Sequence, residues 1–238
     1  MTVRISLWSG PRNVSTALMY SFRSRDDTTV WDEPLFAHYL RVTGVDQPHR
    51  EEVLATMDHD GERVVADVMF GDVTTPVAFF KNMAHHLVDL DESFLDDLAN
   101  VVLTRDPRHM LPSLAEGIPS PQLFETGLPG QVRLVRRALA AGEQPIVVDT
   151  STLLADPEAV LGEVCRRCGI AWDPAMLSWP PGAKPEDGAW GDFWYDSVRR
   201  STGFGAPRSR IRPMPQHLRG LYEECAPLYD EIAAHAIA

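Results

Sequence analysis

The sequence predicts an α/β fold of three layers, in which helices flank a central parallel sheet of about five strands. Short apolar or β-branched runs alternate with longer stretches of helical pattern, which is typical of βαβ units. The strand candidates are continuous apolar runs, as expected for strands that are covered on both faces. Apolar side chains make up 44% of the 238 residues, enough for one sizeable core. A single domain over residues 1–238 is therefore predicted.

The expected elements follow one another along the whole chain. The predicted strands are residues 3–8, 29–31, 77–80, 101–104 and 146–148. The predicted helices are residues 14–25, 35–42, 93–98, 108–115, 131–141, 157–168 and 214–236. Gly169 is well suited to end the helix before it, because glycine readily adopts a left-handed backbone. Residues 178–192 hold several prolines and glycines, which predicts a long irregular loop within the domain.

The charge composition narrows the class of partner. Asp and Glu outnumber Lys and Arg 34 to 22, a net charge of −12, which argues against nucleic acid or an anionic membrane surface as partner. Residues 197–222 nevertheless contain six arginines and no acid. The only lysines are Lys81 and Lys184, so nearly every cation is a guanidinium, the group suited to bidentate contact with oxyanions.

The cysteines and the N-terminus indicate a cytoplasmic protein. An odd count of three cysteines gives no disulfide framework, which fits a reducing compartment. Cys165 and Cys168 form a lone CxxC inside a predicted helix, where a structural pair is favoured over zinc or redox chemistry. No apolar run approaches the roughly 18 residues of a membrane span, and Pro11 and Arg12 interrupt any signal peptide.

A candidate phosphate-binding loop follows the first predicted strand. Residues 7–16 read Leu-Trp-Ser-Gly-Pro-Arg-Asn-Val-Ser-Thr and open a helix, where backbone N–H groups and the helix dipole can hold a phosphate. Ser15 and Thr16 would add hydroxyl donors, and Arg12 is the cation. Val14 stands where a nucleotide triphosphatase loop requires lysine, which disfavours an ordinary ATPase or GTPase. The alternative is a simple strand-to-helix turn with Asn13 as the helix N-cap.

A second candidate anion site follows the fourth predicted strand. Arg105 comes directly after that strand, Pro107 begins a helix, and Ser113 follows Arg105 by eight residues. An arginine at a strand end fits an anion site at the carboxyl edge of a parallel sheet.

Together the two sites resemble the P-loop-like sulfotransferases that use 3′-phosphoadenosine 5′-phosphosulfate (PAPS). The resemblance implies that Arg12, Asn13, Ser15 and Thr16 hold the 5′-phosphosulfate. Arg105 and Ser113 would hold the 3′-phosphate. The segments 147–149, 153–161 and 169–174 are similar to the family's packing segments, so the likeness spans nearly the whole chain. Arg199, Arg200 and Gly203 are similar to the family's basic glycine loop, which closes over the 3′-phosphate and the adenine.

The acceptor's proton requires a base, and several side chains are candidates. Glu33 ends the second predicted strand beside the phosphate loop, and some branches of the family use a Glu there; Asp32 would cap the next helix. Glu33 could also be structural. Met83 replaces the histidine base of the cytosolic branch, while Lys81 is retained and is expected to assist catalysis. The remaining candidates are His85 and His86, as alternative bases or acceptor contacts, and His38 as a lining residue of the acceptor pocket.

The resemblance implies an enzyme that moves a sulfuryl group from PAPS to a hydroxyl or amine of a small-molecule acceptor, with no metal. Arg12 would offset charge on the leaving phosphate. One alternative is a Mg²⁺-dependent phosphotransferase or nucleotide hydrolase with Asp32 and Asp149 as metal ligands; another is a non-catalytic nucleotide-binding domain. Residues 41–75 and 117–130 are expected to set acceptor specificity, since they are polar and punctuated by Pro and Gly.

Overall fold

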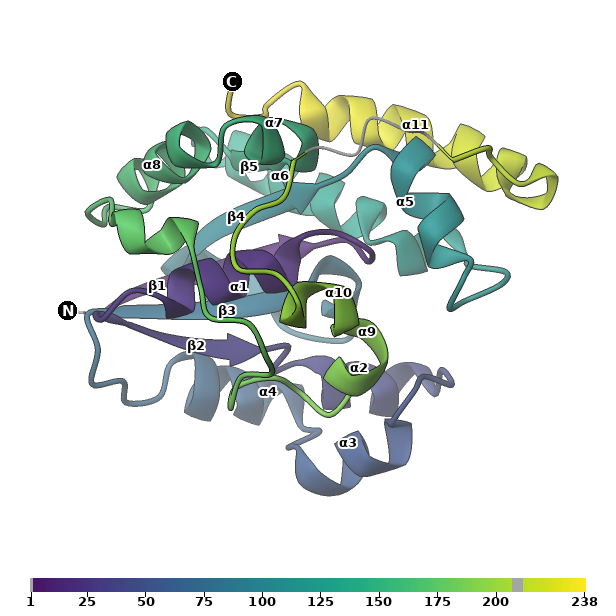
Figure 1. The fold of residues 1–238 in the computed structure, drawn as a ribbon. Coiled ribbons are helices and arrows are strands. Elements are labelled where there is room, and N and C mark those ends of the chain that lie inside the picture. Colours follow the sequence, from purple (N-terminus) through teal and green to yellow (C-terminus); the bar gives the residue numbers. More distant parts are fainter. Residues whose placement is uncertain (1, 207–211) are drawn as a thin grey trace.

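The computed structural model describes residues 2–206 and 212–238. Its centre is a five-stranded parallel sheet in the order β2-β3-β1-β4-β5, which confirms the predicted fold class (Figure 1). The strands are β1 Val3–Ser9, β2 Thr28–Asp32, β3 Val77–Met83, β4 Ala99–Thr104 and β5 Ile146–Asp149. The chain therefore adds β2 and β3 on one side of β1, and β4 and β5 on the other. Ligands of such sheets bind at the carboxyl ends of the strands, where the order reverses.

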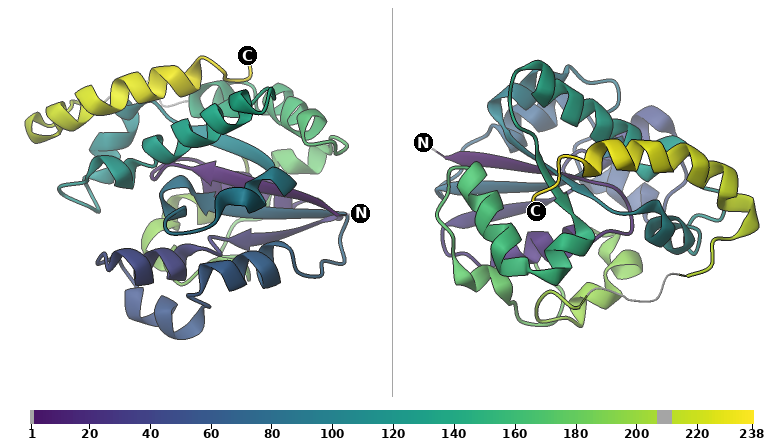
Figure 2. Two further views of the ribbon diagram at one scale, coloured as in Figure 1. Left: turned by 180° about the vertical axis from the view of Figure 1, so that it is seen from behind. Right: turned by 90° about the horizontal axis from the view of Figure 1, so that it is seen from above.

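Helices cover both faces of the sheet, which gives the three layers (Figure 2). One face carries α1 Ser15–Arg23, α8 Pro157–Arg167 and the 3-10 turn η5 Pro174–Leu177. The opposite face carries α4 Gly61–Val64, the π-helical turn η1 Val65–Met69, the 3-10 turn η3 Glu92–Asp97, α5 Pro107–Leu114, α6 Leu128–Ala140 and α11 Arg219–Ala233. The strands between these layers are apolar on both sides, and β3 is buried along its whole length. That residues 1–238 form a single domain stays a prediction.

A third apolar cluster lies beyond the sheet edge and brings distant segments together. It joins α2 Phe36–Thr43 and α3 Arg50–Thr56 to the region around α9 Gly191–Trp194 and α10 Asp196–Arg199. Trp190 and Tyr195 are buried in this cluster against Phe36 and Tyr39. The irregular segment before α9 is thereby held over the carboxyl ends of β2 and β3.

Five predicted helices are confirmed within three residues at each end, and two others differ. The helix predicted at 93–98 is the 3-10 turn η3. The last helix begins at Arg219, five residues later than predicted, after the 3-10 turn η6 Gln216–Leu218. Residues 178–192 are largely irregular, as predicted.

Several short elements were not predicted, because they are too short to show a repeated helical pattern of apolar residues. They are α3, α4, α7 Thr150–Ala155, α9, α10, η1, η2 Ala84–His86 and η4 Leu123–Thr126. Local caps define some of them: Asp60 accepts a hydrogen bond from Arg63 N at α4, and Asp149 accepts one from Ser151 N at α7.

The helix pair of cysteines is structural, as predicted. Cys165 and Cys168 are buried, and burial raises the pKa of their thiols to about 11 and about 12 respectively. Gly169 ends the helix with φ of 73°. In the part of the chain that the structure describes, no group of three or more His, Cys, Asp or Glu side chains is placed to hold a metal ion. Among the described helices, none has the length and apolar character needed to cross a membrane.

Candidate functional site

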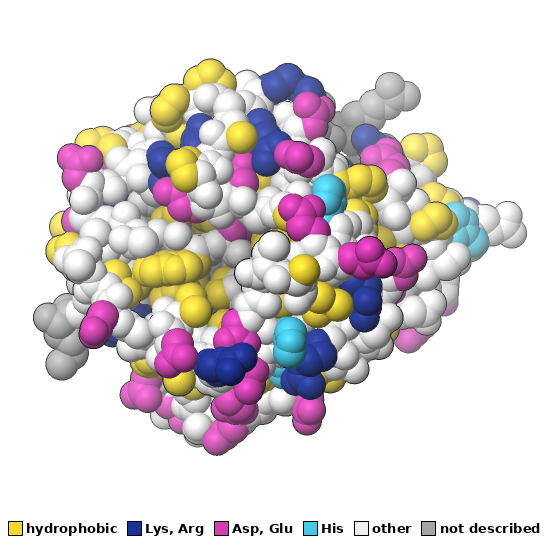
Figure 3. Space-filling model, turned by 90° about the horizontal axis from the view of Figure 1, so that it is seen from below, with side chains coloured by type: hydrophobic (Ala, Val, Ile, Leu, Met, Phe, Trp, Pro, Cys, Tyr) yellow, Lys and Arg dark blue, Asp and Glu magenta, His cyan; other side chains and the backbone are white. Residues whose placement is uncertain are grey.

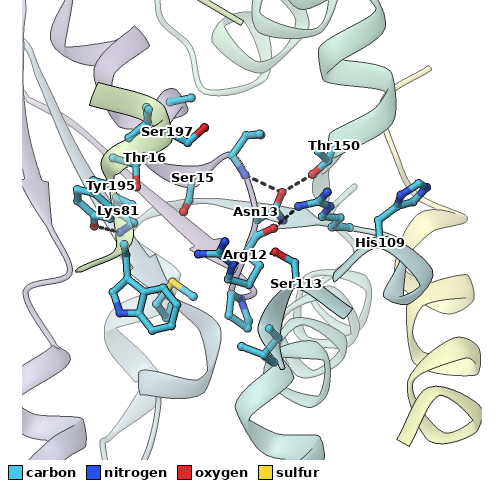
Figure 4. A pocket seen from close by; sticks show the side chains of 18 of the residues that line it. Arg12, Asn13, Ser15, Thr16, Lys81, His109, Ser113, Thr150, Tyr195 and Ser197 are labelled. Carbon is cyan, nitrogen blue, oxygen red and sulfur yellow. Dashed lines mark hydrogen bonds between the residues drawn. The ribbon is translucent and has the colours of Figure 1, made fainter. Parts of the chain in front are cut away.

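A cavity of about 460 Å³ lies at the carboxyl edge of the sheet. Its wall includes the loop after β1, the ends of β2 and β3, one side of α5, the start of α7, and the segment 190–206. Figure 4 shows Arg12, Ser15 and Thr16 facing the same space as Ser113, while Lys81 and Tyr195 stand on another side. The two anion sites predicted from the sequence are therefore parts of one cavity.

The loop after β1 presents the first turn of α1 to this cavity. The helix begins after Val14, and no side chain caps it. Ser15 and Thr16 lie in that first turn, are buried, and line the cavity. A helix start whose N–H groups are not capped by a side chain is suited to bind an anion.

Asn13 is not the helix N-cap that the alternative interpretation required. Its amide nitrogen donates to the carbonyl of Leu103 at 3.1 Å, and its oxygen accepts from the N–H of Val14 at 2.9 Å. The hydroxyl of Thr150 also donates to this oxygen. Asn13 thus ties the loop to the ends of β4 and β5, and it fixes the loop rather than the helix.

Arg12 and Arg105 link the two anion sites directly. The guanidinium of Arg12 donates through Nε to the hydroxyl of Ser113 at 3.0 Å, and Arg105 donates to the backbone carbonyl of Arg12. Arg12 has φ of 54°, a left-handed conformation that costs free energy in a non-glycine residue and is held by its surroundings. Arg105 and Ser113 both line the cavity, as does His109 of α5 between them, which sequence reasoning missed.

The predicted basic glycine loop is only partly at the cavity. Arg199 donates to Asp187 at 3.0 Å and to Asp192 at 2.7 Å, and Arg200 pairs with Asp196. Neither arginine lines the cavity, so local carboxylates hold both cations away from it. Gly203 does line the cavity; an added Cβ there would come within 2.9 Å of the Leu177 carbonyl. Arg208 and Arg210 of the acid-free segment lie outside the described residues.

A buried group of charges stands at the ends of β2 and β3. Asp32 and Lys81 are register partners on adjacent strands. The Lys81 ammonium donates to Asp32 Oδ1 at 2.9 Å, to the Tyr195 hydroxyl at 2.6 Å and to Glu33 Oε1. An ammonium carries three protons, so this set uses all of them.

Tyr195 completes this group from the segment after β5. Its hydroxyl donates to the Asp32 carboxylate at 2.9 Å and accepts from the indole N–H of Trp190 at 2.8 Å. The N–H of Gly188 also donates to Asp32, at 3.0 Å. Asp32 therefore does not cap the next helix, as the sequence had suggested; it anchors residues 188–195 to the sheet. The aromatic density of residues 190–195 was the available sequence signal for this wall.

Burial and the neighbouring charges together set the pKa values of Glu33 and Lys81. Burial raises the pKa of Glu33 to about 7, and the charge of Asp32 adds to this, while Lys81 opposes it. Burial lowers the pKa of Lys81, but the nearby Asp32 and Glu33 carboxylates outweigh it and hold that pKa well above its usual value. Glu33 also has a left-handed backbone, with φ of 48°. Two of the three residues predicted to take part in the chemistry, Arg12 and Glu33, are thus held in strained conformations.

The predicted histidines separate into two environments. His85 and His86 line the cavity, and His86 Nε2 lies 3.9 Å from Glu33 Oε2. Burial lowers the pKa of His85 to about 4 and that of His86 well below its usual value, so both rings are neutral. His38 does not line the cavity. Its ring bonds the carbonyl of Val88 at 2.8 Å and accepts from the N–H of Gly61 at 3.1 Å, which makes it a structural histidine.

The segments expected to set specificity contribute little to the wall. From 41–75 the lining residue is Gln47, and from 117–130 they are Ile118 and Glu125. On the face that Figure 3 shows, acidic and basic side chains are interspersed with hydrophobic ones.

Comparison with known proteins agrees with the geometry. The sulfotransferase domain family matches residues 3–236. Two Arabidopsis thaliana proteins, named branched-chain-amino-acid aminotransferase-like proteins 2 and 1, are 38% and 39% identical in sequence to this chain over 232 residues. These alignments cover 97% of this chain but 41% and 42% of the relatives, so the chain spans about two fifths of their length.

Solved structures share the fold. A sulfotransferase domain from the curacin biosynthetic pathway superposes with a TM-score of 0.55 at 13% identity, covering 98% of this chain and 97% of that one. A sulfotransferase from Alicyclobacillus acidocaldarius gives 0.54 at 13% identity, with 98% and 96% covered.

Proposed function

The chain belongs to the sulfotransferase domain family, and we propose that it moves a sulfuryl group from PAPS to a hydroxyl or amine of a small-molecule acceptor. The observation that carries the proposal is the meeting of two anion sites with a buried carboxylate in one cavity. Arg12 joins the sites through Ser113, and Glu33 lines the same cavity.

The donor half of the cavity suits a nucleotide with anions at two positions. We define this half as Arg12, Asn13, Ser15, Thr16, Arg105, His109, Ser113, Thr150 and Gly203. Ser15, Thr16 and the first turn of α1 would hold the 5′-phosphosulfate. Arg105 and Ser113 would hold the 3′-phosphate. Arg12 would stabilise the charge that develops on the leaving phosphate.

Glu33 would take the proton from the acceptor. A general base works best when its pKa lies near the working pH, and burial raises the pKa of Glu33 to about 7. Lys81 would assist through its fixed positive charge beside Glu33, since its three protons go to Asp32, Glu33 and Tyr195. The acceptor proton is transferred to Glu33 while the acceptor oxygen or nitrogen bonds to sulfur and the bridging bond to the phosphate breaks.

The carboxylates that a magnesium enzyme would need are engaged elsewhere. Asp32 accepts hydrogen bonds from Lys81, Tyr195 and Gly188. Asp149 accepts from the N–H of Ser151 at 2.8 Å and from the Tyr229 hydroxyl at 3.0 Å. Both carboxylates act as structural acceptors here, which favours sulfuryl transfer over magnesium-dependent phosphoryl transfer. The raised pKa of a carboxyl that lines the cavity favours an enzyme over a nucleotide sensor.

Calorimetry with 3′-phosphoadenosine 5′-phosphate (PAP) and with AMP tests the donor. PAP should bind roughly tenfold to a hundredfold more tightly than AMP, because hydrogen bonds to a charged group contribute about 1.5–3 kcal/mol. Arg105→Met should abolish this difference. Arg108→Met is the matched control, since Arg108 is exposed and pairs with Asp106 at the start of the same helix. Equal affinity for PAP and AMP in the unaltered protein would refute the 3′-phosphate site.

A further inference from the structure

We propose that the other half of the cavity recognises a primary ammonium group, so that the acceptor is a compact amine-bearing compound rather than a carboxylate-bearing one. We call this the acceptor half and define it by Glu33, Phe36, Tyr39, Lys81, His85, His86, Glu125, Trp190 and Tyr195. The inference rests on the proposed function, because it assumes that this half holds the acceptor.

Three polar atoms in this half have no hydrogen-bond partner among the described residues. They are the Tyr39 hydroxyl and the Nδ1 atoms of His85 and His86. Tyr39 and His86 are each only 1% exposed, yet both residues line the cavity. A buried polar group without a partner costs free energy, and such groups call for an explanation. A bound ligand that donates hydrogen bonds supplies one.

These atoms can all accept hydrogen bonds. Burial keeps His85 and His86 neutral, since it lowers the pKa of His85 to about 4 and that of His86 well below its usual value. A neutral imidazole has one nitrogen that accepts, and a tyrosine hydroxyl accepts as well as donates. An ammonium has three donors and no acceptor, so it is complementary to this set.

Stacked aromatic rings support the same conclusion. His86 stacks on Phe36, at 5.1 Å, and on Tyr39, at 4.7 Å between ring centroids, and the Phe36 and Tyr39 rings are themselves 6.4 Å apart. Trp190 meets Phe36 edge to face at 4.8 Å. Aromatic faces attract cations and contribute more where water is excluded.

The charges in this half oppose an anion. Lys81 is its cation, and the three protons of the ammonium go to Asp32, Glu33 and Tyr195. Glu33 and Glu125 are its carboxyl groups. The charge of Glu125 acts on Tyr39, where it adds to the effect of burial in raising the pKa of the Tyr39 hydroxyl. A carboxylate on the acceptor would be repelled by Glu125, and the Lys81 ammonium has no proton left to bind it. An ammonium on the acceptor would instead be attracted by the Glu125 carboxylate.

Three phenols that differ in one substituent test the proposal by binding alone. The probes are phenols with a para 2-aminoethyl, ethyl or carboxymethyl group, titrated by calorimetry into the full chain saturated with PAP. We expect the amine to bind about tenfold more tightly than the ethyl compound, which corresponds to about 1.4 kcal/mol, and the carboxylate to bind most weakly. An amine that binds no better than the ethyl compound, or a carboxylate that binds best, overturns the proposal.

Two variants locate the selectivity. Glu125→Gln and Tyr39→Phe should each reduce the preference for the amine at least threefold; both changes are nearly isosteric, and the lost Tyr39 hydroxyl has no described partner. Glu116→Gln is the matched control, because Glu116 is exposed, pairs with Arg212 and lies outside the cavity lining. A preference that survives in both variants overturns the assignment.

The outcome is separable from that of the proposed function. If PAP does not bind, the donor assignment fails, and the same titrations on the protein alone still decide the ammonium site. If PAP binds and the amine preference is absent, the acceptor class fails while the donor site stands.

Discussion

The two halves of the cavity are built by different means. The donor half combines arginines and hydroxyl side chains with backbone groups at a helix start, and seven of its nine residues lie in two sequence segments, 12–16 and 105–113. The acceptor half is a buried charge cluster at the ends of β2 and β3, walled by aromatic rings from α2, η2 and the region of α9. An anion needs N–H groups and a cation on a short loop, which a local motif can encode. A buried ion cluster needs partners from elements far apart in sequence.

This difference has an energetic consequence. Side chains in the donor half have cavity or solvent beside them, so losing one removes ligand contacts more than it removes fold stability. In the acceptor half the residues that hold the base also hold the sheet edge to residues 188–195. Substitutions there should change the chemistry, the stability or both, and the ratio between these effects differs from residue to residue.

The largest effect is expected from Glu33→Gln, which should lower the rate of sulfuryl transfer roughly 10²- to 10⁴-fold, the usual contribution of a general base. The amide cannot take the acceptor proton, although it preserves the shape of the side chain. PAP affinity should stay within about twofold, because the donor half is untouched. Transfer of labelled sulfate and calorimetry measure the two quantities. Glu231→Gln, a surface change in an ion pair with Arg136, serves as the control. A Glu33→Gln protein with normal turnover would remove Glu33 as the base.

The next effect contrasts the two lysines of the chain. Lys81→Met leaves Asp32 and Glu33 buried without their cation, and we expect the free energy of unfolding to fall by about 3–5 kcal/mol. Without Lys81 the pKa of Glu33 rises further, so the loss is greatest at high pH. Lys184→Met should cost less, about 1–2 kcal/mol, since Lys184 donates to two backbone carbonyls, of Pro180 and Gly182. Denaturant unfolding at pH 8 compares them; equal losses would contradict the buried-pair interpretation.

The sheet, most helices and the donor half could be predicted from the sequence because their signals are local. Continuous apolar runs mark the strands, and Arg12 and Arg105 stand directly after strand ends. The partners of Asp32 could not be predicted, since Tyr195 lies 163 residues away and meets it only through the fold. Arg199 and Arg200 differ in that their partners are close in sequence: Asp187, Asp192 and Asp196 pair with the two guanidinium groups, and neither arginine lines the cavity.

The pH dependence of transfer offers a milder test of the acceptor half. Glu33 is active as the carboxylate, and burial raises its pKa to about 7, so kcat/KM should rise about tenfold per pH unit below 7 and level off above it. The raised pKa of Glu33 also makes the stability of the fold depend on pH, but in the opposite direction: stability falls as the pH rises. The folded protein retains this proton from the ordinary pKa of 4.5 up to about 7, so raising the pH through that window lowers the free energy of unfolding.

The pH dependence of PAP binding provides the comparison with the donor half. PAP affinity should not follow the titration of Glu33, because the side chains assigned to the two phosphates are arginines and hydroxyls. A profile of kcat/KM that stays flat between pH 5 and 8 would show that a group other than Glu33 accepts the proton.

The smallest effect is expected from a pair of hydroxyl deletions, one in each half. Tyr195→Phe removes the acceptor for Lys81 and Trp190 and the donor to Asp32, at a cost of about 1–3 kcal/mol. Thr150→Val removes a hydroxyl that bonds the Thr104 carbonyl at 2.9 Å and Asn13, and should cost about 0.5–1.5 kcal/mol.

The two deletions should separate further in function. Tyr195→Phe frees one proton of Lys81 and leaves Asp32 with one donor fewer, so the distribution of charge around Glu33 changes and the acid limb of the kcat/KM profile moves. Thr150→Val touches only the donor half and should leave that limb in place while weakening PAP binding through the loosened Asn13. If the acid limb of the kcat/KM profile shifts in both variants, or in neither, the donor and acceptor halves do not act independently of each other.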